Sequence, residues 1–240
     1  MKRLKIIIFC FITVFTMSAQ NYMAEYLSEK NICRMIFNTS TWRYEYNSNF
    51  KVSIEVNNTE LDDESTSYSK PLSTFNFRSL DKNYYLDEEI LVSPKEKYIV
   101  KGELIKPEWT ILSDSVKIIE NYTCLMAKGH VRGRDYTVWF TPDIPVSAGP
   151  WKLWGLPGLI VSAASDDGVV KEITMISLKQ TDLAPVDPLV EKTITPKEYR
   201  VLYQEAMNKF IRKIRSLSEG SSVVDANIIS FNPPDKSLFE

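Results

Sequence analysis

The chain has 240 residues, with 29 Lys and Arg against 31 Asp and Glu, so its formal net charge is −2. It is 44% hydrophobic and 12% aromatic, and it contains one His and three Cys. These values describe a globular protein with enough apolar material for a core. They argue against a disordered chain, a disulfide-dense miniprotein and a polytopic membrane protein. The near-neutral balance also argues against nucleic-acid binding, which usually requires a basic excess.

The N-terminus has the three-part layout of a secretory signal peptide. A basic start, Met1–Lys5, precedes an apolar run, Ile6–Met17, and Ser18–Ala19 offers small residues for cleavage. The apolar run is shorter than the roughly 20 residues that a transmembrane helix needs. We therefore expect residues 1–19 to be a signal peptide and residues 20–240 to form one exported domain, periplasmic or secreted. We expect no transmembrane span in the mature chain.

Alternation of apolar and polar residues predicts antiparallel strands through much of the chain. The segments are rich in β-branched and aromatic residues, and they are 42–46, 52–56, 98–104, 122–131, 136–141, 159–163 and 169–178. Arg132–Gly133–Arg134 and Asp166–Asp167–Gly168 indicate hairpin turns, because glycine adopts a positive φ at low cost. The acidic, Ser-rich stretch 62–69 predicts a surface loop.

One long helix is predicted at about 196–217. Thr195 and Glu198 form a capping box around Pro196, which suits the first helical position. Apolar residues then recur at three-and-four spacing, and Gly220 is the expected terminator. The fold class is therefore α+β, mainly antiparallel β, with a curved sheet or half-barrel and the helix packed on its concave face or mouth.

The sequence contains no recognisable catalytic motif. His130 is the single histidine and would have to serve any Ser–His–acid or Cys–His device, yet it falls in a predicted strand. Neither a phosphate-binding loop nor a dinucleotide-binding glycine pattern occurs. We therefore assign no catalytic residue and no cofactor, and we favour a non-enzymatic protein.

Two other functions stay open from the residues alone. A hydrolase could use Asp135 or Asp143 with Arg134, because paired carboxylates supply the acid and the base in glycosidases. A metal-handling protein could use Cys124 and His130, although these two lack the spacing typical of a zinc site. Neither alternative has a second motif in the sequence to support it.

Cys33 and Cys124 are the two cysteines that follow the predicted signal peptide. In an oxidising compartment they are a candidate disulfide, which would stabilise the fold by roughly 4 kcal/mol. The alternative is that both are buried, reduced thiols acting as small hydrophobic side chains. Both interpretations stay open, because the sequence does not show whether the two Cα atoms come within about 7 Å.

The segment Thr141–Ile160 concentrates unusual residues: four of the 12 prolines and three of the eight glycines. Pro150 is expected to start a single helical turn that Gly155 ends. The segment could close the core, or it could form the rim of an aromatic-lined cleft. The candidate ligand-binding residues in and around it are Trp109, Arg134, Trp139, Asp143, Trp151 and Trp154.

Gly155–Leu–Pro–Gly–Leu–Ile160 is the signature of the GLPGLI family of exported bacterial proteins, and the chain resembles that family over residues 109–178. Trp109–Thr–Ile, Tyr122–Thr–Cys124 and Gly133–Arg134–Asp–Tyr–Thr–Val–Trp–Phe–Thr141 occur in the family's order. The resemblance implies a secreted, β-rich protein of the cell envelope. It transfers no catalytic residue, and it suggests an association with outer-membrane transport systems.

We therefore expect a non-enzymatic binding or accessory protein of the cell envelope. Its partner would be an apolar or peptide ligand, or an outer-membrane transport system.

Overall fold

The computed structural model describes residues 20–48, 72–91 and 96–218. The predicted signal peptide at 1–19, the predicted strand at 52–56, the predicted loop at 62–69 and the helix terminator Gly220 lie outside these residues.

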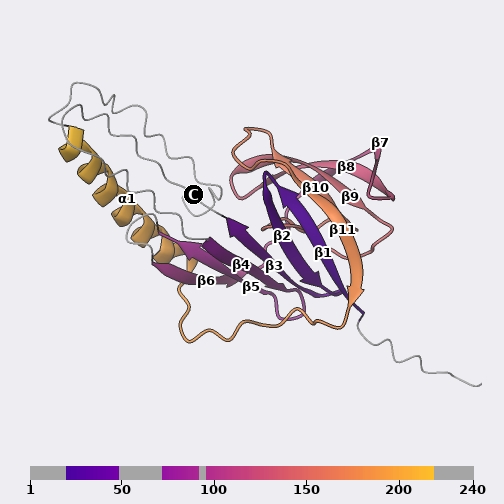
Figure 1. Ribbon diagram of the computed structural model, residues 1–240, viewed down its shortest axis with the longest axis horizontal. Helices are drawn as coiled ribbons and strands as arrows, with labels where there is room; N and C mark the ends of the chain where they lie inside the picture. Colours follow the sequence, from indigo (N-terminus) through magenta and orange to yellow (C-terminus); the bar gives the residue numbers. More distant parts are fainter. Residues whose placement is uncertain (1–19, 49–71, 92–95, 219–240) are drawn as a thin grey trace, which may run out of the picture.

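Eleven strands and one helix make up the described chain (Figure 1). The first six strands are β1 (Asn21–Ser28), β2 (Asn31–Phe37), β3 (Thr41–Ser48), β4 (Leu72–Ser79), β5 (Tyr84–Ile90) and β6 (Lys97–Glu103). The other elements are β7 (Trp109–Ile119), β8 (Tyr122–Val131), β9 (Arg134–Thr141), β10 (Leu159–Ser165), β11 (Ile173–Thr181) and α1 (Pro196–Ser218).

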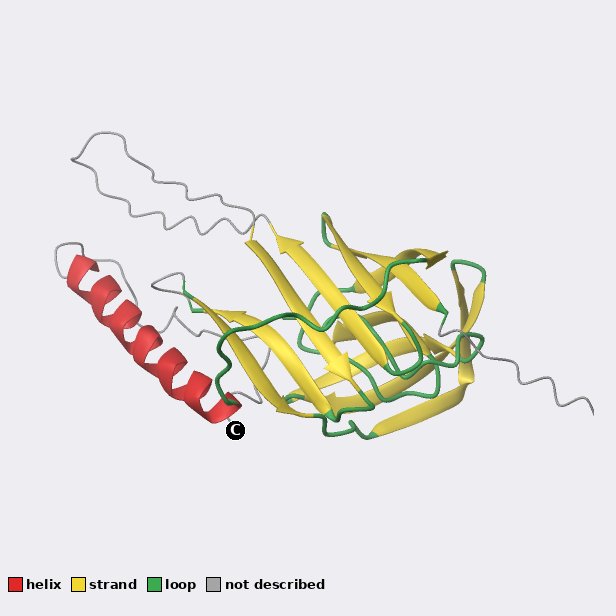
Figure 2. Cartoon of the chain, turned by 90° about the horizontal axis from the view of Figure 1, so that it is seen from below, coloured by secondary structure: helices red, strands yellow, loops and turns green. Residues whose placement is uncertain are grey.

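The strands form one antiparallel sheet in the order β6-β5-β4-β3-β2-β1-β11-β10-β9-β8-β7. Two meanders, β1 to β6 and β7 to β11, are joined where β1 pairs with β11. Only residues 104–108 connect β6 to β7, the two edge strands. These residues reach at most about 20 Å, whereas a flat sheet of this width would hold its edges about 48 Å apart. The sheet must therefore curl so that its edges approach, as the views show (Figures 1 and 2).

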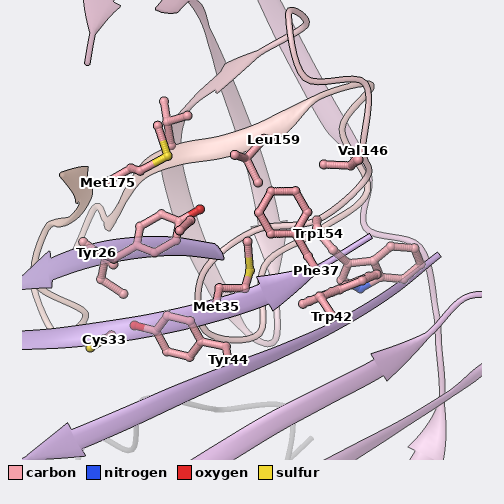
Figure 3. Close-up of a cluster of buried hydrophobic side chains, with 14 of the residues drawn as sticks. Tyr26, Cys33, Met35, Phe37, Trp42, Tyr44, Val146, Trp154, Leu159 and Met175 are labelled. Carbon is pink, nitrogen blue, oxygen red and sulfur yellow. The ribbon is translucent and has the colours of Figure 1, made fainter. Parts of the chain in front are cut away.

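The interior of the curled sheet is filled by residues 142–158, called here the Pro/Gly segment. Val146, Ala148 and Trp154 of this segment are buried in a cluster with side chains of β1, β2, β3, β10 and β11 (Figure 3). The Trp154 ring lies 6.2 Å from the Trp42 ring. Leu153 and Leu156 are buried in a second cluster with residues of β8, β9 and β10. The segment thus closes the core, which is one of the two roles expected of it.

The backbone of the signature hexapeptide, residues 155–160, requires glycine at both of its glycine positions. Gly155 has a φ of 101°, a conformation that costs glycine little and other residues more. A Cβ atom added at Gly158 would lie 2.2 Å from the carbonyl oxygen of Thr141, so this position allows no side chain. The motif therefore has a structural explanation: it lets the Pro/Gly segment pass close to the end of β9.

The predicted helical turn at Pro150 is not formed. The Leu153 N–H donates to the Pro150 carbonyl at 3.2 Å, which closes a tight turn. Trp151 has a φ of 55°, outside the right-handed helical region, and this prevents a helical turn.

Helix α1 begins as predicted. The Glu198 N–H donates to Thr195 Oγ1 at 3.2 Å, and the Thr195 N–H donates to Glu198 Oε2 at 2.7 Å, which is a reciprocal capping box. The helix packs against edge strand β6 (Figure 1). Tyr199, Tyr203 and Ala206 bury their side chains against residues of β5 and β6, among them Val100. Val100 pairs with Asp87, so the helix covers the end of the sheet face that the Pro/Gly segment also contacts. This position at the end of the concave face agrees with the expected place at the mouth.

The fold class is confirmed: a curved, mainly antiparallel sheet with one long helix near the C-terminus. The strand predicted at 169–178 begins later, at Ile173, and five strands were not predicted: β1, β2, β4, β5 and β7. Among the described residues, no helix is both long and apolar enough to cross a membrane.

Candidate functional site

A buried carboxylate, Asp87 of β5, is the centre of a cluster of charged side chains. Asp87 Oδ1 accepts a hydrogen bond from Arg78 Nη1 of β4 at 2.5 Å, and another from Asn76 Nδ2 at 2.9 Å. The side chains of Arg78 and Asp87 are 0% and 1% exposed. Charges buried this deeply are tolerated only when they are paired and hydrogen-bonded.

Two further cations reach Asp87 from distant parts of the chain. Lys152 of the Pro/Gly segment places Nζ 3.8 Å from Asp87 Oδ2 and 2.5 Å from Glu89 Oε1. Arg132, in the turn between β8 and β9, places Nη2 3.7 Å from Asp87 Oδ2. The cluster thus connects the β4–β5 hairpin to the Pro/Gly segment and the β8–β9 hairpin. Because both meanders contribute, it exists only in the curled sheet.

The cations outweigh burial in setting the ionisation of Asp87. Burial by itself would raise the pKa of this carboxyl group, but the charges of Arg78, Lys152 and Arg132 together hold that pKa below its ordinary value. Asp87 is therefore ionised at neutral pH.

Two of the guanidinium groups lie near the same aromatic ring. The Cζ atoms of Arg78 and Arg132 lie 5.0 Å and 4.9 Å from the centroid of the Tyr85 ring. Cation–π contacts at these distances are attractive, and they keep both guanidinium groups in place beside Asp87. Arg132 itself has a φ of 51°, a backbone conformation that its side chain disfavours.

Trp151, next to Lys152, is a second residue in a strained conformation. Its backbone φ is 55°, which is a genuine outlier for a bulky residue. Its ring packs against Tyr136 with centroids 6.1 Å apart, and Lys152 Nζ lies 5.4 Å from the ring centroid. Trp151 is half-buried, so part of its surface is accessible to solvent. This places a partly exposed aromatic side chain beside the charged cluster.

The other three predicted tryptophans have different surroundings. Trp109 is half-buried, and its Nε1–H donates to the Trp154 carbonyl at 2.8 Å. Trp154 is buried in the core. Trp139 is half-buried and has Lys117 Nζ 5.6 Å from its ring centroid. The alternation of β9 puts Trp139 on the face opposite Tyr136, the residue that Trp151 contacts.

The residues of the predicted hydrolase site are not brought together. Asp135 and Asp143 lie at opposite ends of β9, an eight-residue strand, so roughly 25 Å of extended chain separates them. Glycosidase carboxylates lie at most about 9.5 Å apart. Arg134 is buried and forms an ion pair with Asp167 of the next turn. Asp143 is exposed beyond the strand end.

The residues of the predicted metal site are also apart. Cys124 and His130 are six positions apart along β8, or about 20 Å of extended strand. Cys124 is buried, whereas His130 is exposed and pairs with Asp135 at 2.8 Å. No group of three or more His, Cys, Asp or Glu with metal-site geometry occurs within the described ranges.

The candidate disulfide between Cys33 and Cys124 is not formed, and the structure has the other of the two open alternatives. Both are buried free thiols. Cys33 lies on β2 and Cys124 on β8, five strands away in the sheet order, and each thiol has a local contact instead. Cys33 lies beside Tyr44, and Cys124 Sγ lies 3.3 Å from the Tyr122 carbonyl oxygen. Burial raises the pKa of both thiols.

Sequence reasoning missed the residues at the centre of the cluster, Arg78, Asp87 and Lys152. Strand β5 has no clear alternation, since Tyr84–Ile90 reads Tyr-Tyr-Leu-Asp-Glu-Glu-Ile, and the short alternation Phe75-Asn76-Phe77-Arg78 in β4 was overlooked. Without predicted strands, Arg78 and Asp87 look like ordinary surface charges. The unusual composition around Lys152 was a signal, but it pointed to the tryptophans rather than to the lysine between them.

Comparisons with known proteins place this fold without naming an activity. A family model described as "Protein of unknown function (Porph_ging)" matches residues 131–162, which cover β9, the Pro/Gly segment and the start of β10. This stretch contains the hexapeptide on which the GLPGLI resemblance rests, and the matched model bears a different name. No curated protein matches the chain.

Two solved structures of PNGF-II are similar in fold. One, in space group P21, has a TM-score of 0.53 and 17% identity, and the match covers 78% of this chain and 34% of that one. The other, in space group C2, has a TM-score of 0.50 and 19% identity, with 80% and 33% covered. At such identities the likeness concerns the fold alone. This chain thus corresponds in fold to about a third of the PNGF-II chain.

Proposed function

We propose that the protein is a non-enzymatic binding or accessory protein of the cell envelope, which holds an apolar or peptide ligand against the exposed part of the Trp151 ring. The single observation behind this proposal is the backbone of Trp151, a bulky side chain at a φ of 55°. Such strain costs of order 1–3 kcal/mol and is concentrated at ligand clamps and active sites. Here it keeps an aromatic ring at the surface.

The surroundings of Trp151 support a recognition role. Tyr136 supports one side of the ring, and Lys152 adds a cation near it. Rigid aromatic side chains give a large contact area at a low cost in conformational entropy. The turn that holds the ring also lies in a segment anchored by core side chains, so the ring is held in place before a ligand arrives.

The N-terminus favours an exported protein. The basic, apolar and small-residue order of residues 1–19 is typical of a secretory signal peptide. Export is testable by expressing the chain with residues 1–19 in a Gram-negative host. We expect protein in the periplasm or the medium whose N-terminal sequence begins near Gln20.

Ligand binding is tested with a pool of tetrapeptides rich in Leu and Phe, captured by the protein and counted by mass spectrometry. We expect the protein with Trp151→Gly to retain the pool at least fivefold less than the unchanged protein. Glycine adopts the φ of 55° without strain, so this variant removes the ring and leaves the turn intact.

The matched control is Asn83→Gly. Asn83 also has a positive φ, 51°, but lies in the β4–β5 turn away from Trp151. It should retain peptides as the unchanged protein does. Equal retention by the Trp151→Gly variant, or no retention by any variant, would show that Trp151 does not contact a peptide ligand.

A further inference from the structure

Glu89 is the more exposed of two carboxylates that pair with Lys152. Lys152 Nζ and Glu89 Oε1 are 2.5 Å apart, and the Glu89 side chain is 19% exposed. The Asp87 carboxylate on the other side of Lys152 is 1% exposed. Lys152 thus forms ion pairs with a deeply buried carboxylate, Asp87, and with a partly exposed one, Glu89.

The same lysine also lies over the aromatic ring of the proposed ligand site. Its Nζ is 5.4 Å from the Trp151 ring centroid as well as 2.5 Å from Glu89. A ligand that covers the exposed part of Trp151 is therefore brought close to the ion pair between Lys152 and Glu89.

The cations of the cluster contact Asp87 as well as their other partners. Arg78 and Arg132 form ion pairs with Asp87 and lie near the Tyr85 ring. Lys152 keeps Asp87 as a neighbour at 3.8 Å. Among the residues joined by these contacts, three cations face two carboxylates. A carboxylate that exchanged with Glu89 would leave the charge balance of the cluster unchanged, whereas removal of Glu89 without replacement would leave three cations facing one carboxylate.

We propose that Glu89 occupies the place of an acidic group of the ligand, and that a peptide carboxylate displaces it from Lys152 on binding. This inference rests on the proposed function, because it names the class of ligand that the Trp151 site takes: a peptide with an apolar part and a carboxylate. The carboxylate can come from the C-terminus of the peptide or from a Glu side chain. Both present the same chemistry to Lys152.

The exchange makes Glu89 a competitor of the ligand, and this gives two substitutions opposite effects. Glu89→Gln removes the competing charge, so the fraction of the protein that can receive a carboxylate rises, and the apparent affinity rises with it. Lys152→Met removes the cation that both carboxylates need. A purely structural ion pair would not make Glu89→Gln a better binder.

Three tetrapeptide pools with the same apolar residues test the proposal. One has neutral side chains and a free C-terminal carboxylate, the second is amidated and contains one Glu, and the third is amidated and neutral. We expect the unchanged protein to retain at least one acidic pool about tenfold more than the neutral pool. Whichever acidic pool is preferred identifies the source of the carboxylate.

We expect Glu89→Gln to raise retention of that acidic pool about fivefold and to leave the neutral pool unchanged. The control is Glu88→Gln, which removes the same charge from the next residue, whose partner is Lys97; it should change neither pool. Lys152→Met should reduce the acidic pool to the level of the neutral one. Because Lys152 is 4% exposed, the double variant Lys152→Met, Glu89→Gln is included to avoid an unpaired glutamate.

The outcomes separate this inference from the proposed function. If all three pools are retained equally, and Trp151→Gly reduces them all, Trp151 binds peptides and the carboxylate exchange is refuted. If Glu89→Gln weakens or does not change retention of the acidic pool, the exchange is refuted as well. If no pool is retained, both proposals fail.

Discussion

At the scale of single residues, a few residues adopt environments or backbone conformations that disfavour folding. Arg78 and Asp87 are almost completely buried, and Trp151 and Arg132 adopt a positive φ. Each of these choices opposes folding on its own, and each is compensated by a neighbour: a counter-ion, a hydrogen bond or an aromatic face. The charged cluster is therefore expected to be sensitive to loss of any one partner.

Replacement of Asp87 by Asn should lower the free energy of unfolding at neutral pH by about 3 kcal/mol or more. The substitution removes the anion that compensates the buried guanidinium group of Arg78, and a broken buried ion pair typically costs this much. Urea unfolding followed by circular dichroism measures the change. Glu88→Gln, on the same strand but at an exposed ion pair, should cost less than about 1 kcal/mol.

The same carboxylate should make stability depend on pH in the acid range. The pKa of Asp87 is lower in the folded protein than its ordinary value of 3.8, so its ionisation stabilises the fold at pH values above 3.8. This contribution is lost as the pH falls below 3.8 and through the lower folded-state pKa. Urea unfolding between pH 7 and pH 2.5 should show a steeper loss for the unchanged protein than for Asp87→Asn. Parallel curves would contradict the assignment.

The two buried cysteines should be reduced and unreactive in the folded protein. Burial raises the pKa of both thiols, so little thiolate exists at pH 8, and access to it is poor. A thiol reagent should label native protein lacking residues 1–19 only slowly, and should label two thiols per chain after denaturation without reductant. No labelling of the denatured protein would mean that Cys33 and Cys124 are joined after all.

At the scale of elements, the Pro/Gly segment performs several tasks with one stretch of chain. It fills the curled sheet with Val146 and Trp154, passes β9 closely at Gly158, and supplies Trp151 and Lys152 to the candidate site. A sequence so dense in proline and glycine loses less conformational entropy on folding where proline fixes φ, and glycine permits the close approaches.

Substitution of Gly158 by Ala should lower the free energy of unfolding by about 2 kcal/mol or more. The new methyl group would meet backbone atoms of Thr141 at 2.2 Å and 2.7 Å, and backbone cannot move aside as a flexible side chain can. Gly168→Ala is the control: its φ is 71°, but a Cβ there meets nothing within 4 Å, so only the backbone preference is lost. Gly168→Ala should lower the free energy of unfolding by about 1 kcal/mol, and urea unfolding measures both variants.

The elements differ in how well their sequences predicted them. Helix α1 and strands β8 and β9 were predicted because capping, hairpin and alternation signals agreed there. Strand β5 was missed because Asp87 faces inward among apolar residues, so polar and apolar residues no longer alternate. In β4 the alternation is short, and the polar residues Asn76 and Arg78 are the ones that face Asp87. The charged cluster was not predicted either, because its residues stand at inward-facing strand positions where apolar residues are expected.

At the scale of the whole molecule, the two meanders are held together in three places. The first is the pairing of β1 with β11, the second is the core that the Pro/Gly segment fills, and the third is the Asp87 cluster. Strands β1 to β6 therefore contact the second meander both through the β1–β11 pairing and through side chains inside the curled sheet. Neither meander buries its inner face without the other.

The described fold should consequently unfold in a single transition. Tryptophan fluorescence, which reports mainly on the Pro/Gly segment and its surroundings, and far-ultraviolet circular dichroism, which reports on the whole sheet, should give the same midpoint in urea. Leu156→Ala creates a cavity in the second core cluster, and it should shift both midpoints equally. Separate midpoints would mean that the meanders are independent folding units.

The sequence by itself determined the fold class and the long helix with its capping box, because these depend on neighbours within a few positions along the chain. Only the tertiary structure decided that the Pro/Gly segment closes the core, that both thiols are free, and that Arg78, Arg132 and Lys152 meet at Asp87. A buried charge is stable only through its neighbours in space. Those neighbours come together only when the sheet curls and brings β5, the β8–β9 turn and residue 152 to one place.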